Sequence, residues 1–141
     1  MPTVFESNTM KNGADEEIIV IPPIKLVWSE WVPWPHFNID SRFGAGVIVP
    51  NGQPGVYEVR YADTEERLTI GKAADLRMRL KQGLVKGKTP HSAGQAIRAN
   101  EDTMKLVVRW AVTERPSAVE EELHRQYRAK FGKLPKYVQH T

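Results

Sequence analysis

The chain has 141 residues, of which 40% are hydrophobic and 26% are charged. These values are typical of one ordinary globular domain, and they exclude a disordered chain. No apolar run approaches the ~20 residues of a membrane-spanning helix, so we expect no membrane partner. The sequence has no cysteine, which excludes disulfides and thiolate metal sites. It also lacks the basic-then-apolar N-terminus of a signal peptide, and the two features together favour a cytoplasmic location.

The formal net charge of +3 is unevenly distributed along the chain. Residues 1–17 contain four acids and one lysine, a net charge of −3, which leaves +6 for residues 18–141. The first 17 residues lack hydrophobic periodicity, and we interpret them as a flexible acidic tail. The basic remainder suits a polyanionic partner such as nucleic acid, although a basic surface without any partner is also common.

Residues 18–53 form an arm rich in tryptophan and proline. We expect residues 18–21, a short apolar run, to be extended and to lie against the domain. Trp28, Trp31 and Trp34 follow, with prolines between and after them that exclude a helix. These rings have two interpretations: a stacking platform for bases, or packing over the sheet. We favour packing, because a small domain needs the buried area.

A hairpin and a basic helix are predicted next. Side chains alternate over residues 56–61, which is typical of a strand, and residues 68–70 form a short returning strand. Asp75 can then cap a helix over about residues 75–82. Residues 86–94 form a basic, glycine-rich loop, which could contact a phosphate backbone or be an ordinary exposed loop.

The last two elements are the clearest in the chain. Residues 104–112 alternate as a strand that is apolar on nearly both faces. Pro116 suits the start of a helix over residues 116–131, and Gly132 suits its end. The buried stripe of this helix is Val119, Leu123, Tyr127 and Phe131. Together these elements predict an α+β fold of the α/β sandwich type, with a mainly antiparallel three-stranded central sheet flanked by helices.

Four segments, in order, resemble the GIY-YIG nuclease superfamily. Gly55-Val56-Tyr57 matches the first signature triplet, and Thr69-Ile70-Gly71 stands at the second, with threonine where the family usually has tyrosine. The helix entry that begins at Lys72 resembles that of the family and carries the family arginine at Arg79. Glu120 lies at the position of the family's metal-binding glutamate. The resemblance covers residues 54–141 and implies a GIY-YIG-like nuclease domain.

This resemblance implies a metal-dependent endonuclease that hydrolyses DNA, of a repair, restriction or mobile-element type. Its catalytic residues would be Tyr57, Lys72, Arg79 and Glu120. Glu120 would hold one divalent cation, Mg²⁺ or Mn²⁺. Tyr57 would act near the attacking water, its phenol made more acidic by neighbouring cations, and Lys72 and Arg79 would grip the phosphate. Further contacts to the substrate would come from Thr69, Lys86, Lys88 and His91.

Each of these residues also has an ordinary structural explanation. Tyr57 could be a core tyrosine, Arg79 and Lys72 a solvated helix face, and Glu120 a surface acid. The alternative function is therefore a non-catalytic nucleic-acid-binding domain that retains the GIY-YIG fold, and a protein-interaction module built on the tryptophan arm is a third. The presence of all four residues in order favours the endonuclease.

Overall fold

A four-stranded antiparallel sheet forms the centre of the protein. The computed structural model describes residues 16–38, 48–86 and 93–138. The strands are β1 (Val32–Pro33), β2 (Gly55–Tyr61), β3 (Arg67–Ala73) and β4 (Leu106–Val112), in the spatial order β1-β4-β2-β3. The predicted mixed α+β class with an antiparallel sheet is confirmed. The predicted number of three strands is wrong, because Val32 and Pro33 of the arm pair with β4 as a short edge strand.

Strand β2 occupies a central position, paired along its length with both β3 and β4. Gly55, at its start, lies directly against the Ala111 carbonyl of β4, so that a larger residue would collide with backbone. The other long strands differ slightly from prediction. β3 extends beyond residues 68–70 at both ends, and β4 begins at Leu106 because residues 103–105 form a 3₁₀ turn.

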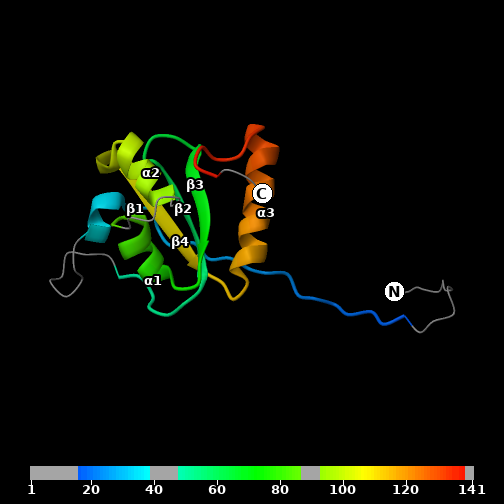
Figure 1. Cartoon of the computed structure of the whole chain (residues 1–141). Helices are drawn as coiled ribbons and strands as arrows, with labels where there is room; N and C mark the ends of the chain where they lie inside the picture. Colours follow the sequence, from blue (N-terminus) through cyan, green and yellow to red (C-terminus); the bar gives the residue numbers. More distant parts are fainter. Residues whose placement is uncertain (1–15, 39–47, 87–92, 139–141) are drawn as a thin grey trace.

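Helices cover the face of the sheet from which the Tyr57 side chain of β2 projects. Helix α1 (Leu76–Met78) begins at Asp75, whose side chain accepts a hydrogen bond from the Met78 N–H at 3.3 Å, as predicted for its cap. The chain continues as one π-helical segment, η3 (Arg79–Leu84), instead of the regular helix expected over residues 75–82. Helix α2 (Ala93–Asn100) packs beside it, and α1 and α2 appear together on one side of the sheet in Figure 1.

Helix α3 (Pro116–Phe131) lies on the other side of the sheet (Figure 1) and has the bounds that the sequence predicted. Gly132 ends it in the left-handed conformation, with φ of 76°, which glycine adopts without strain. Val119 packs with Val56 and Ala111 of the sheet in a second, smaller core. Among the helices of the described residues, none combines the length and apolar character needed to cross a membrane.

The arm divides into an exposed part and a packed part. Residues 16–24 run away from the body of the fold (Figure 1), and Ile18 and Ile21 are 80% and 64% exposed. The expectation that residues 18–21 lie against the domain is therefore wrong. Trp28 packs against the α3-side core, whereas Trp34 is buried in the core on the opposite face of the sheet. The arm thus passes from one face to the other at the β1 edge.

Glu101 ties the C-terminal segment to the fold. Its carboxylate accepts hydrogen bonds from the Tyr61 and Tyr137 hydroxyls, each at 2.6 Å, and from Lys136 Nζ at 2.7 Å. The Tyr137 N–H also donates to the Leu68 carbonyl on the outer edge of β3 at 2.8 Å. The segment after α3 therefore covers part of that edge.

Candidate active site

Tyr57 lies in the central strand and its ring reaches over the edge strand β3. Its backbone partner in β3 is Gly71. A Cβ added at Gly71 would come within 2.6 Å of both Cζ and the hydroxyl oxygen of Tyr57, so the ring occupies the space that a side chain at Gly71 would fill. Tyr57 is only 5% exposed. A residue larger than glycine at position 71 would therefore displace the phenol.

Two side chains from distant parts of the chain act on this phenol. Burial raises the pKa of Tyr57 above its ordinary value, whereas the positive charge of Arg79 and a hydrogen bond from Arg79 lower it, and the Glu120 carboxylate raises it. The net direction is upward, so the expectation of a more acidic phenol is wrong, because burial outweighs the cation. Tyr57 is therefore a protonated hydroxyl at neutral pH, and the charges of Arg79 and Glu120 are near enough to influence its pKa.

Lys72 lies next to Gly71 and contacts the first turns of α3. Its Nζ donates a hydrogen bond to the Ser117 hydroxyl at 3.0 Å, and Ser117 is one helical turn before Glu120. Both Lys72 and Arg79 are exposed, and Glu120 is partly exposed. The structure therefore gathers the predicted catalytic residues around one end of β3. It leaves two cations available to an incoming anion.

Gly83 lies in the same helical segment as Arg79, four residues after it. A Cβ at Gly83 would lie 3.3 Å from Cδ of Arg79, so this glycine leaves room for the arginine stem. The π-helical turn begins at Arg79 itself. Such turns often occur at functional sites, since they change the direction of a side chain relative to a regular helix.

The predicted substrate-binding residues are less well supported by their positions. Thr69 is buried within β3, so its hydroxyl does not form part of the surface. Lys86 is exposed just after η3. Lys88 and His91 lie outside the described residues.

Glu120 is the predicted metal ligand of this site. Within the described residues, no group of three or more His, Cys, Asp or Glu side chains is arranged to hold a metal ion. A single carboxylate at a partly exposed position fits Mg²⁺, which keeps several of its waters and commonly takes one or two carboxylates together with substrate phosphate.

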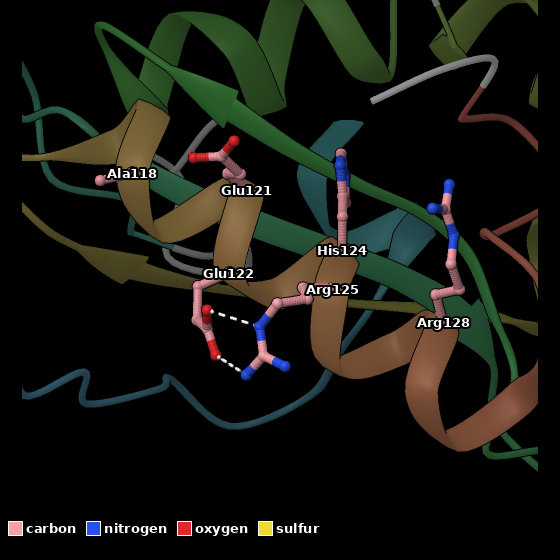
Figure 2. Close-up of a pocket in the computed structure, with 6 residues that line it drawn as sticks. All are labelled: Ala118, Glu121, Glu122, His124, Arg125 and Arg128. Carbon is pink, nitrogen blue, oxygen red and sulfur yellow. Dashed lines mark hydrogen bonds and ion pairs between the residues drawn. The ribbon is translucent and has the colours of Figure 1, made fainter.

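His124 is a buried residue near this site whose role the sequence did not reveal. It is 6% exposed, and its Nε2 lies 2.9 Å from the Ile70 carbonyl of β3. It lines a pocket of about 410 Å³. Figure 2 shows its side chain projecting from α3, between those of Glu121 and Arg128. Helix periodicity alone does not identify the partner of His124, because that partner lies on another element of the fold.

Two tryptophans of the arm, Trp28 and Trp31, contact arginines on the α3 side of the sheet. Glu58 Oε1 accepts hydrogen bonds at 2.9 Å from Nε of Arg67 and at 2.9 Å from Nε of Arg109. Trp28 lies 4.0 Å from the Arg109 guanidinium, and Trp31 lies 4.6 Å from it. These ring faces already have cationic partners, which favours the packing interpretation over base stacking.

Comparisons with known proteins gave no match, whether with protein-family models, with curated proteins or with solved structures.

Proposed function

We propose that the protein is a metal-dependent endonuclease of the GIY-YIG type that hydrolyses DNA phosphodiester bonds. The observation that carries this proposal is the meeting of Tyr57, Arg79 and Glu120 at one end of β3. They come from a strand, a helical turn and a second helix that are far apart in sequence. A tyrosine that only fills a core does not need a cation and a carboxylate near its hydroxyl.

The chemistry follows from the charge of the substrate. A phosphodiester repels nucleophiles, so hydrolysis requires cations on the phosphate and a group that holds the attacking water. The exposed Arg79 and Lys72 supply positive charge for the phosphate oxygens. The protonated Tyr57 hydroxyl would orient the attacking water by hydrogen bonding, and would not act as a phenolate that is already deprotonated in the resting protein. Glu120 would hold Mg²⁺ or Mn²⁺, which when bound supplies a charge that stabilises the leaving oxygen.

A non-catalytic DNA-binding domain is the second candidate. The burial of Thr69, at the position of the second family tyrosine, favours it, because that position supplies no hydroxyl to the surface. The net charge of +6 on residues 18–141 suits either function. In both cases binding should depend on contacts to phosphates. Each neutralised phosphate releases about 0.9 of a counterion, so the affinity for DNA should fall steeply as the salt concentration rises.

The deciding experiment measures cleavage of supercoiled plasmid, branched DNA and single-stranded DNA by the protein. Each DNA is incubated with Mg²⁺ or Mn²⁺, and with a chelator as the control. We expect cleavage that requires the metal. Salt-sensitive binding without cleavage under any of these conditions would favour the binding domain. Salt-insensitive binding, or none at low ionic strength, would contradict both candidates.

A further inference from the structure

Two hydrogen bonds between side chains of helix α3 and the backbone of the edge strand β3 hold these two elements together. Nε2 of His124 lies 2.9 Å from the Ile70 carbonyl oxygen, and the Arg67 N–H donates to the Tyr127 hydroxyl at 3.1 Å. A carbonyl oxygen only accepts hydrogen bonds, so Nε2 of His124 carries the proton and donates. The same nitrogen is therefore unavailable to a substrate.

The two bonds differ in their distance from the candidate active site. His124 follows Glu120 by four residues, which is one helical turn, about 6 Å along the axis. Its partner Ile70 directly precedes Gly71, the residue beneath the Tyr57 ring. The His124 bond therefore joins the helical turn that carries Glu120 to the stretch of strand that supports Tyr57. The Tyr127 bond lies about two turns from Glu120.

We propose that His124 is a positioning residue. Its hydrogen bond to the Ile70 carbonyl fixes the position and rotation of α3 relative to β3, and this keeps Glu120 near the Tyr57 hydroxyl. Its catalytic consequence rests on the proposed nuclease function, but the placement of Glu120 can be measured without substrate. A histidine that only filled space could be replaced by an apolar residue of similar size. A positioning histidine can be replaced only by a side chain that donates from the same point.

The test compares three variants. His124→Leu removes the donor and keeps apolar bulk. His124→Gln restores an N–H at a reach similar to that of Nε2. Tyr127→Phe is the matched control, since it removes the second of these two side-chain-to-backbone bonds, about two turns from Glu120.

The first measurement is the ¹⁹F chemical shift of a fluorotyrosine placed at position 57, in metal-free protein at neutral pH. Glu120→Gln defines the shift change caused by loss of the carboxylate. We expect His124→Leu to move the resonance in the same direction, and to add little when combined with Glu120→Gln. His124→Gln and Tyr127→Phe should stay close to the unmodified protein.

The second measurement is metal-dependent DNA cleavage. A displacement of about 1 Å at a catalytic group costs on the order of a hundredfold in rate. We therefore expect kcat to fall about tenfold to a hundredfold in His124→Leu, with KM nearly unchanged, and to recover in His124→Gln.

The proposal is overturned if His124→Leu leaves the fluorine resonance in place, or if Tyr127→Phe moves it equally. If His124→Leu does not fold, His124→Asn replaces it, because its shorter amide does not reach the carbonyl, and the same outcomes apply. If the unmodified protein cuts no DNA, the proposed function fails, while the fluorine comparison still decides the role of His124.

Discussion

Replacing Glu58 by glutamine tests how the arm is held on the α3 side of the sheet. The side chain of Glu58 is 5% exposed, and it is the shared acceptor of Arg67 and Arg109. Glutamine keeps the shape but removes the negative charge. Both guanidiniums then remain largely buried without this counter-charge, beneath the rings of Trp28 and Trp31.

The structure sets the size of the effect. Removing one partner of a buried ion pair costs roughly 3–5 kcal/mol, because the other charge stays desolvated. The side chains of Arg67 and Arg109 retain 14% and 21% exposure, which allows partial rehydration. We therefore expect about 3 kcal/mol, at the lower end of that range. For a chain of this size, this corresponds to a fall in Tm of about 6–12 °C.

Urea unfolding followed by tryptophan fluorescence measures this loss. The matched control is Glu65→Gln, because the Glu65 side chain is 73% exposed and its oxygens lie 3.8 Å from Arg60 and 4.0 Å from Arg67. Such an exposed pair contributes less than about 1 kcal/mol. Equal destabilisation by Glu58→Gln and Glu65→Gln would refute the conclusion that a buried carboxylate organises this face.

Three further predictions concern the Tyr57 phenol, Gly71 beneath it and the hydrogen-bonded carboxylate of Glu101. Glu120→Gln should lower the pKa of Tyr57 and Arg79→Gln should raise it, because the two charges act in opposite directions; ¹⁹F titration of a fluorotyrosine at position 57 measures both, and an unchanged value would contradict the geometry. Gly71→Ala should displace the ring and reduce kcat by about tenfold or more, in protein shown to be folded by circular dichroism; normal cleavage would count against the site. Burial raises the pKa of Glu101, but its three hydrogen-bond donors outweigh burial and hold that pKa at about 2, below the ordinary 4.5. The stabilisation that the Glu101 carboxylate contributes is therefore complete above pH 4.5 and lost as the pH falls toward 2. Over this range, the urea midpoint of the unmodified protein should fall more steeply with pH than that of Glu101→Gln. Parallel curves for the two proteins would contradict a stabilising role of this carboxylate.

The elements that the sequence predicted well are those with local signals. The alternation over residues 56–61 sufficed to predict β2, because successive side chains of a strand point to opposite faces of the sheet. Pro116 and Gly132 marked both ends of α3, since each suits a backbone conformation that occurs at one kind of helix end.

The elements that the sequence missed depend on distant contacts. Strand β1 is two residues long and includes Pro33, and only pairing with β4 makes it a strand. The bond of His124 to Ile70 depends on how α3 lies along β3, which no helix pattern contains. The raised pKa of Tyr57 depends on the depth of burial, whereas the sequence revealed only the nearby cations.

The most direct test of the proposed nuclease compares the rates of metal-dependent DNA cleavage by two variants, Glu120→Gln and Glu121→Gln. Successive helical residues are turned by about 100°, so the two acids face different directions. Glu120 is partly buried beside Tyr57, whereas Glu121 is exposed. We predict that Glu120→Gln abolishes metal-dependent cleavage and binds DNA equally or slightly more tightly, because it repels phosphate less, and that Glu121→Gln cuts nearly normally. Cleavage by Glu120→Gln at the rate of the unmodified protein would contradict the assignment of this site.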